Sequence, residues 1–351
     1  MASIVEVAKR ARVSIATVSR VLSASPHPVS EDTRARVIDA AQALAYSPSA
    51  LAKAMVTGST RIVGVIIGDA TDPYFAAIVR GVEDVARECG YLVIVCNADR
   101  LPAIELNYLK ILNGYRADGV VLAGGGLTDP AYLRSIGPAL DAFRRRGAAV
   151  VSLGKHLFES LSVLVDNRQL TIDATEHLLS LGHRDIAYIS GPDQITTSGL
   201  RLDGHRQALA RHGLEPRDDC LLLGDYSFEA GLSAATQIAA LRRIPTAVLA
   251  SNDLMAIGCL VGLKRAGYRV PQQISIMGID DITAAQFVDP PLTTVSIPLY
   301  ESGAIGMESL IRLRNGEARS GDEILLAHRV VVRQSTATVR MKAPAKRGSP
   351  R

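Results

Sequence analysis

Residues 5–22 read VEVAKRARVSIATVSRVL, and this stretch decides the fold of the N-terminal part of the chain. Apolar residues recur at helical spacing up to Ala11, and Ser14 is a suitable N-cap for a second helix that ends near Leu22. Ser30, which two acidic residues follow, predicts the start of a third helix that runs to about Leu44. Three short helices with a tight turn after the first are typical of a helix-turn-helix module, whose second helix enters the major groove of DNA.

The second predicted helix presents candidate DNA contacts at its N-terminal end. Arg20 can bind a guanine edge bidentately, and Ile15 and Ala16 can pack against base edges or thymine methyl groups. Hydroxyl and basic side chains can position the module through phosphates without reading sequence. We expect this second role for Ser3, Lys9, Ser14, Thr17 and Arg36. The alternative is a generic three-helix packing module with Arg20 on a solvated face.

The charge of the chain is unevenly distributed. The net charge is only +4, but residues 1–61 hold eight basic and four acidic residues, and residues 340–351 hold five basic residues and no acid. Residues 62–339 therefore carry 4 − 4 − 5 = −5. Basic ends on a mildly acidic body are consistent with a polyanion that is held by one end of the protein.

Composition and motifs exclude several classes of protein. Apolar residues make up 48% of the chain, which supports folded cores, and the four cysteines show no spacing typical of metal or disulfide frameworks. The N-terminus has no signal pattern and no apolar run approaches a membrane span, so we expect a soluble cytoplasmic protein without a membrane partner. No catalytic, cofactor-binding or metal motif is present, and Gly124–Gly126 is interpreted as a flexible loop. The sequence thus predicts neither enzyme activity, nor a cofactor, nor a metal.

From Ile62 onward, buried strands alternate with amphipathic helices. This alternation predicts doubly wound parallel sheets, in which ligands bind beyond the carboxyl ends of the strands. The strands are expected at 62–68, 91–97, 119–123, 148–153, 185–190, 247–250 and 275–279. Polar and aromatic side chains follow several of them, which makes these loops the candidate ligand site. The loops are residues 69–75, 191–201, 224–226, 252–253 and 280–281.

Residues 5–22, 29–37 and 45–55 together resemble the lactose/galactose-repressor (LacI/GalR) family, and the resemblance extends over nearly the whole chain. Its most specific part is the string VSxxTVSRVL at residues 13–22. The resemblance implies an all-α helix-turn-helix domain at 1–47, a hinge helix and linker at 48–61, and a basic tail at 341–351. Between them, residues 62–340 would form an α/β two-lobed sensor and dimerisation domain that is similar to periplasmic binding proteins.

The resemblance also assigns the hinge. In the family, paired hinge helices order on operator DNA and insert an apolar side chain into the minor groove. The matching residue is Met55, where the family usually has Leu, and Ala52 and Lys53 would lie along the same groove. The alternative is that Met55 only packs against the body of the protein.

Three departures from the family pattern concern glycine and arginine. Arg12 and Ala45 stand where the family usually has Gly, which should cost on the order of 1 kcal/mol each if φ is positive there. Gly199 stands where sugar-binding members commonly have Arg, which puts the usual sugar ligand in doubt. Arg201 falls at the second basic position of the family. Two roles are possible for it, a contact to the ligand or a structural ion pair.

The resemblance implies that the sensor has an aromatic platform with polar partners around a small-molecule effector, which would be a sugar or a related metabolite. The effector-binding residues would be Asp72, Tyr74, Phe75, Thr197, Arg201, Tyr226, Asn252 and Asp280. Loop capping is the alternative role for Tyr226 and Asn252, and a structural role is expected for Asp281.

The expected function is that of a homodimeric transcription regulator, a repressor that binds a pseudo-palindromic operator with an affinity set by a carbohydrate-like effector. An inducing effector is the working hypothesis. One alternative is a solute-binding protein of a transporter, and another is a DNA binder that senses no effector.

Overall fold

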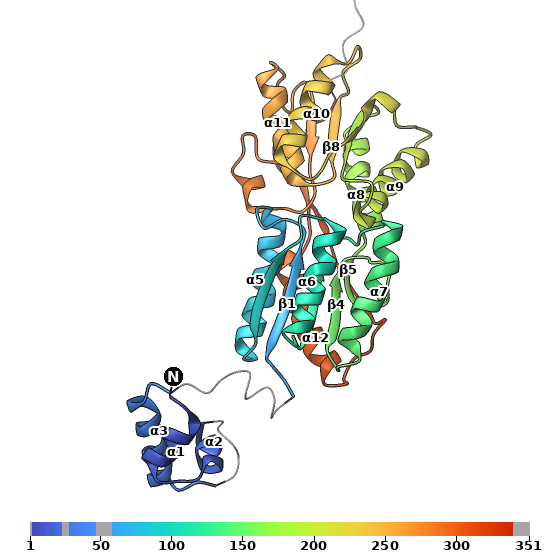
Figure 1. The fold of residues 1–351 in the computed structure, drawn as a ribbon. Coiled ribbons are helices and arrows are strands. Elements are labelled where there is room, and N and C mark those ends of the chain that lie inside the picture. The colour runs from blue at the N-terminus through green and yellow to red at the C-terminus, as the bar shows by residue number, and fades with distance from the viewer. Residues whose placement is uncertain (1, 23–27, 47–57, 340–351) are drawn as a thin grey trace, which may run out of the picture. The chain divides into compact units, whose positions relative to one another are not determined.

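The computed structural model describes residues 2–22, 28–46 and 58–339. Contacts divide the chain into two units, residues 1–61 and residues 62–351, and each unit has its own core (Figure 1).

The first unit is helical, with α1 at Ile4–Ala11, α2 at Ile15–Leu22 and α3 at Glu31–Ala43. Its core contains the fully buried side chains of Val7, Val18 and Val37, one from each helix. The N-caps Ser3 and Ser30 accept hydrogen bonds from the first turns of α1 and α3. The predicted helix-turn-helix arrangement is therefore confirmed.

Both positions where the sequence replaces an expected glycine have left-handed backbone. Arg12 has φ of +53° directly after α1, and Ala45 has φ of +46° two residues after the end of α3. A side chain at positive φ meets steric strain that glycine avoids. Both residues therefore have the positive φ at which replacing glycine is expected to cost on the order of 1 kcal/mol.

The second unit contains two α/β lobes, and the first is built on a six-stranded parallel sheet. Its strand order is β11 (Glu323–Leu326), β5 (Leu161–Val165), β4 (Ala149–Leu153), β3 (Gly119–Ala123), β1 (Ile62–Ile67) and β2 (Leu92–Asn97). Helices α5 (Pro73–Glu88) and α12 (Leu299–Arg314) pack together on one face, and α6 (Pro102–Gly114) and α7 (Pro130–Arg144) pack on the other. Alternate strand residues bury toward each face, as Val65 and Ile66 do.

The second lobe repeats this plan with a four-stranded parallel sheet. Its order is β7 (Leu221–Leu223), β6 (Ile186–Ser190), β8 (Ala247–Ala250) and β9 (Ser275–Met277). Helices α8 (Asn167–Ser180) and α9 (Thr196–Arg211) pair with each other, as do α10 (Phe228–Ala240) and α11 (Asp253–Arg265). Short 3-10 helices occur at Asp218–Cys220 and Thr283–Gln286. The predicted doubly wound parallel architecture is confirmed in both lobes.

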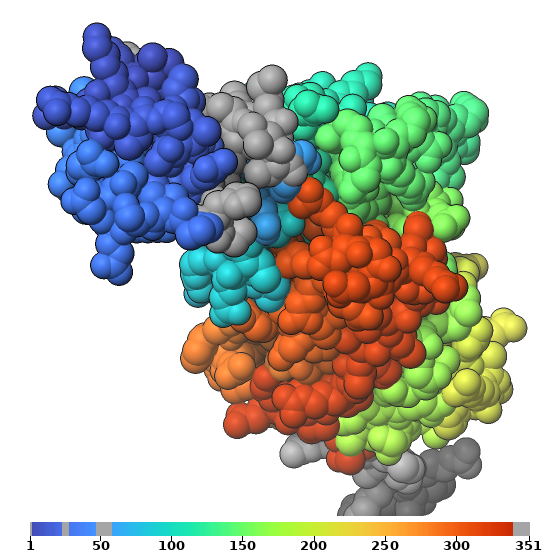
Figure 2. All heavy atoms as spheres, turned by 90° about the horizontal axis from the view of Figure 1, so that it is seen from below, coloured from blue at the N-terminus to red at the C-terminus, as the bar shows by residue number. Residues whose placement is uncertain are grey.

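The chain passes between the lobes three times. It leaves lobe 1 after β5, returns to it from β10 (Thr294–Ser296) into α12, and leaves again from β11 into β12 (Arg329–Val331). Strands β10 and β12 pair antiparallel, so the second and third passages are hydrogen-bonded to each other. In the space-filling view of Figure 2, the orange-to-red part of the chain extends from beside the green residues of lobe 1 to beside the yellow-green residues of lobe 2.

The described residues lack two kinds of feature. None of their helices is long and apolar enough to cross a membrane. Nor do the described histidine, cysteine and acidic residues form a group of three or more that could hold a metal ion.

Candidate functional site

Helix α2 has one face that is exposed and one face that is buried. Ile15 is 47% exposed, and Ala16 and Arg20 are exposed as well, whereas Val18 and Val21 are buried in the core of the helical unit. The helical period thus separates the residues that hold α2 in place from those that can meet a base edge. This is the arrangement that major-groove reading by a recognition helix requires.

The hydroxyl groups expected at phosphates take part in local capping. The Ser14 hydroxyl accepts from the Thr17 amide at 3.1 Å and lies 2.9 Å from the Thr17 hydroxyl. Ser3 forms a reciprocal capping box with Glu6, whose carboxylate accepts from the Ser3 amide at 2.7 Å. All three hydroxyl-bearing residues lie at helix N-termini, where amide groups also favour anions. The hinge candidates Ala52, Lys53 and Met55 lie outside the described residues.

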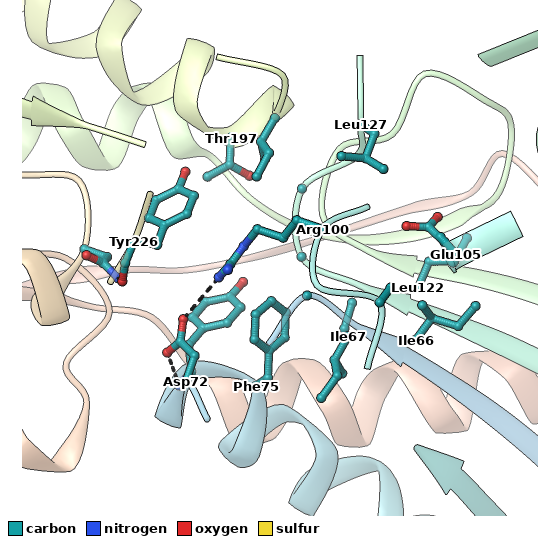
Figure 3. Close-up of a pocket in the computed structure, with 18 of the residues that line it drawn as sticks. Ile66, Ile67, Asp72, Phe75, Arg100, Glu105, Leu122, Leu127, Thr197 and Tyr226 are labelled. Atoms are coloured by element: carbon teal, nitrogen blue, oxygen red, sulfur yellow. Dashed lines mark hydrogen bonds and ion pairs between the residues drawn. The ribbon is translucent and has the colours of Figure 1, made fainter. Parts of the chain in front are cut away.

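A cavity that opens to solvent lies where the two lobes meet (Figure 3). All eight residues expected at the effector site line it, although they come from five separate segments, in loops or near the start of the helices α5 and α9 that follow them. They are Asp72, Tyr74, Phe75, Thr197, Arg201, Tyr226, Asn252 and Asp280. The loops follow β1, β6, β7, β8 and β9, at the carboxyl ends of parallel strands.

A buried ion pair forms the lobe 2 side of the cavity. The Arg201 guanidinium donates to Asp280 Oδ1 at 3.2 Å, and the two side chains are only 4% and 5% exposed. Arg201 also donates to the Asn167 side chain at 2.8 Å and to the Ser251 carbonyl. Burial raises the pKa of Asp280 to about 7, against the opposing effect of Arg201. Arg201 therefore combines a structural ion pair with a place in the cavity wall.

On the lobe 1 side, Asp72 caps α5 and faces the cavity. Its carboxylate accepts from the Tyr74 amide at 3.0 Å and from Arg100 at 3.5 Å. Burial raises the pKa of Asp72, and the Tyr74 amide and Arg100 oppose that shift. Two carboxylates, Asp72 and Asp280, thus face the cavity from opposite lobes, where each can accept hydrogen bonds from neighbouring hydroxyl groups.

The aromatic residues meet at the same place. The Tyr74 and Phe75 rings pack edge to face with centroids 5.0 Å apart. Tyr226 adopts φ of +73°, and its hydroxyl lies 2.8 Å from that of Ser198. Gly191 makes room for this ring, since a Cβ there would overlap the phenol of Tyr226. Strained backbone held in place by its surroundings is a common property of binding sites.

Asn252 has a structural role in addition to its place in the wall. Its side chain caps α11 by accepting from the Met255 amide at 3.0 Å, and it donates to the Tyr226 carbonyl at 2.9 Å. Loop capping, the alternative considered for this residue, is therefore part of what it does. Asp281 accepts from Arg333 at 2.5 Å and does not line the cavity, which agrees with its expected structural role.

Sequence reasoning missed three polar residues of the cavity: Arg100, Glu105 and His156. Arg100 follows β2, and its guanidinium lies 5.7 Å from the Phe75 centroid and 5.5 Å from that of Tyr226. Glu105 accepts from the Tyr132 hydroxyl at 2.5 Å. Burial lowers the pKa of His156 to about 4. The loop after β2 was identifiable as the carboxyl end of a predicted strand, and that was the available signal for Arg100.

One interpretation of glycine residues needs correction. Gly124–Gly126 is a closely packed crossing rather than a flexible loop, because a Cβ at Gly125 would overlap Thr197 and one at Gly126 would lie 2.9 Å from His156. The Thr196 amide donates to the Gly126 carbonyl at 2.9 Å across the lobes. Gly199 is exposed within α9 and does not line the cavity.

Comparisons with known proteins agree with this geometry. The family model of bacterial regulatory proteins of the lacI family matches residues 3–49, and that of the periplasmic binding protein-like domain matches residues 175–336. The chain is 35% identical to the HTH-type transcriptional repressor CytR of Escherichia coli (strain K12) over 338 residues, which cover 95% of this chain and 96% of CytR. The chain belongs to the LacI family.

This LacI-family chain is also similar to solved structures of complexes with DNA or with a sugar. One is the Lac repressor dimer bound to operator and the anti-inducer ONPF, with a TM-score of 0.85, 27% identity, and coverage of 96% of this chain and 99% of that one. Another is the complex of the transcriptional regulator CelR with cellobiose, with a TM-score of 0.71, 28% identity, and coverage of 95% and 100%. The LacI-family chain is accordingly a DNA-binding transcription regulator with an effector-binding domain.

Proposed function

We propose that this LacI-family chain is a homodimeric repressor whose affinity for a pseudo-palindromic operator is set by a carbohydrate-like effector in the cavity between its lobes. The observation that carries the proposal is the cavity itself, in which two carboxylates, a buried guanidinium and aromatic rings converge from both lobes. The same chain presents an exposed recognition surface on α2. It would act as a regulator in the cytoplasm, where the DNA is, and not as an enzyme.

On the operator, the proposal gives base reading to Arg20, Ile15 and Ala16, since these lie exposed on α2. Ser3, Ser14 and Thr17 would bind phosphates beside the helix N-termini. Ala52, Lys53 and Met55 would follow the minor groove, with Met55 as the apolar wedge.

In the cavity, Asp72 and Asp280 would accept from ring hydroxyls while Arg201 and Asn252 donate to ring oxygens. Phe75, Tyr74 and Tyr226 would contact the faces of the ring, and Thr197 would add a hydroxyl contact. Because these groups belong to both lobes, a bound effector favours one degree of lobe closure. If the effector prefers one degree of lobe closure, its binding changes the affinity for the operator by some factor. By reciprocal linkage, operator binding changes the affinity for the effector by the same factor.

The test is a thermal-shift screen of the intact protein against sugars, sugar acids, sugar phosphates and nucleosides, followed by operator-binding measurements with each hit at fixed salt. We expect at least one compound both to stabilise the protein and to change operator affinity, and Asp280→Asn to lose both effects. Weaker operator binding in its presence identifies an inducer. Stabilising compounds that leave operator affinity unchanged would contradict the proposal.

A further inference from the structure

The end of lobe 1 that lies opposite the cavity carries a group of exposed arginines. The cavity lies at the carboxyl ends of the parallel strands, so the amino ends of these strands form the opposite end of the sheet. Arg116 lies in the turn between α6 and β3, and Arg145 and Arg146 lie in the turn between α7 and β4. The side chains of all three are exposed. We call these three residues the basic edge.

The fold holds the residues of the basic edge close together. Strands β3 and β4 are neighbours in the sheet, so the turns that precede them lie next to each other. The Arg146 guanidinium reaches the other turn, where it donates to Asn113 Oδ1 at 2.8 Å and to the Ala117 carbonyl at 3.5 Å. Burial lowers the pKa of Arg146, and the nearby charge of Arg116 lowers it further, against the opposing effect of Asp118. Like charges therefore gather at this end of lobe 1.

The carboxylates nearest to the basic edge in the sequence are paired with other arginines. Asp118 is buried and pairs with Arg314 at 2.6 Å, and Asp141 pairs with Arg144 at 3.0 Å. The two groups that accept from Arg146 are a side-chain amide oxygen and a backbone carbonyl, and neither carries a charge. A bound anion would reduce the repulsion between the guanidinium groups of the basic edge.

The chain from the helical unit enters lobe 1 at the same end. Strand β1 lies beside β3 and begins at Ile62, so residues 58–61 lead to the amino ends of the strands (Figure 1). Figure 2 views lobe 1 from this end. The DNA-binding unit is thus tethered where the basic edge lies. Duplex DNA carries one negative charge per about 1.7 Å of its axis, and the guanidinium group suits phosphate oxygens well.

We infer that the basic edge binds the phosphate backbone of DNA and gives the sensor domain a second DNA contact that reads no sequence. The inference rests on the DNA binding proposed for α2 and adds a surface to it. Arg116 and Arg145 each bind a phosphate, whereas Arg146 joins the two turns and contributes charge. Such contacts strengthen binding to all sequences alike and make it more sensitive to salt.

Salt titrations of DNA binding by the intact protein test the inference. One duplex has random sequence, and a second of equal length carries an operator selected in vitro with the wild type. Arg116→Gln/Arg145→Gln should weaken binding to both duplexes. Each phosphate contact contributes about 0.9 to the slope of log K against log salt concentration. Between about 50 and about 200 mM KCl, the double variant should therefore lose about tenfold less affinity than the wild type.

A matched control separates position from net charge. Arg206→Gln/Arg211→Gln removes the same charge from exposed positions on α9 in lobe 2, and it should keep the salt dependence of the wild type. Thermal unfolding of each variant shows whether it is folded, since arginines near helix C-termini also stabilise helices. If the double variant does not fold, Arg145→Gln alone decides, with about half of the effect.

The outcomes separate this inference from the proposed function. Unchanged salt dependence in the basic-edge variants overturns the inference, even if operator affinity falls, because the arginines then act through the protein and not through phosphates. An equal reduction in the control variant overturns it as well, since only net charge matters in that case. If selection with the wild type enriches no operator, sequence reading by α2 fails, whereas the random duplex still decides about the basic edge.

Discussion

The helical unit and the cavity place their functional residues in opposite environments. Arg20 and Ile15 lie exposed within one short helix, and the core beneath them does not depend on them. Arg201, in helix α9, and Asp280, in the loop after β9, are both buried, lie far apart in the chain and hold each other in place. We conclude that the DNA-reading surface can change sequence without changing the fold, whereas the cavity residues contribute to stability and binding together.

The largest expected effect comes from breaking the buried ion pair. Arg201→Met leaves the Asp280 carboxylate without its guanidinium partner, and this should lower the free energy of unfolding by about 3–5 kcal/mol. Urea unfolding of the intact protein measures it. Arg168→Met removes a pair with Asp203 in which both side chains are about half exposed, and it should stay within about 0.5 kcal/mol of the wild type. If Arg201→Met and Arg168→Met lowered the free energy of unfolding by similar amounts, the buried ion pair would contribute no more to stability than the exposed one.

Arg20→Ala should act on operator binding and not on stability. The unfolding free energy should stay within about 0.5 kcal/mol, while affinity for the best operator falls by about 1–3 kcal/mol and sequence preference relaxes. Arg36→Ala, at another exposed position, should weaken all DNA sequences alike, as a phosphate contact would. Titration of specific and random DNA at one salt concentration distinguishes the two. Unchanged operator affinity in Arg20→Ala would show that this residue reads no base.

The buried histidine of lobe 2 gives the sensor a pH dependence that the exposed helix α2 has no group to produce. His205 stacks on Tyr188 at 4.7 Å, and burial lowers its pKa to about 3. Its contribution to stability is present above the unfolded pKa of about 6.5 and is lost as pH falls toward 3, because only the unfolded chain takes up the proton.

His205→Gln removes this contribution. The difference in unfolding free energy between wild type and variant should shrink by up to about 1.4 kcal/mol per pH unit below 6.5. Denaturant titrations at pH 7, 6 and 5 give the comparison. Parallel curves for the two proteins would mean that His205 has the same pKa in the folded and the unfolded chain.

The smallest effect belongs to the strained turn of the helical unit. Arg12→Gly relieves a residue at φ of +53° and should stabilise this unit by about 0.5–1 kcal/mol. Hydrogen exchange of the α1 and α3 amides in the intact protein measures the gain. Arg10→Gly, inside α1, is the matched control and should destabilise the unit by a similar amount. A loss of protection in Arg12→Gly would show that its side chain makes a contact worth more than the strain.

The sequence predicted the helical unit well because its information is local. Caps, helical spacing and the specific string at residues 13–22 all fall within a short stretch, and the three helices begin and end close to the expected residues. The parallel sheets were predicted through their long apolar strands. Strands β5, β7 and β11 were missed. β7 has only three residues and β11 carries exposed residues, so their pairing comes from tertiary contacts, whereas β5 was missed although it is as long as the predicted strand β3.

For the cavity, the loops were predictable but the roles were not. The rule that ligands bind at the carboxyl ends of parallel strands located the loops, and the resemblance to the family selected the eight residues within them that line the cavity. It could not show that Arg100 reaches across to Tyr226, or that Asn252 caps α11, since both depend on how the lobes and loops pack.

The three passages between the lobes have a mechanical consequence. A single connection would let the lobes swing and rotate freely, whereas three connections, two of them joined by the β10–β12 ladder, act as a strap hinge that bends about one axis and resists twisting. A small molecule that binds between the lobes then needs to fix only the angle between the two lobes in order to change the conformation of the domain. Each lobe is built from two separate segments of the chain. A cut in any one of the three passages therefore disrupts the effector-binding lobes as well as the hinge between them.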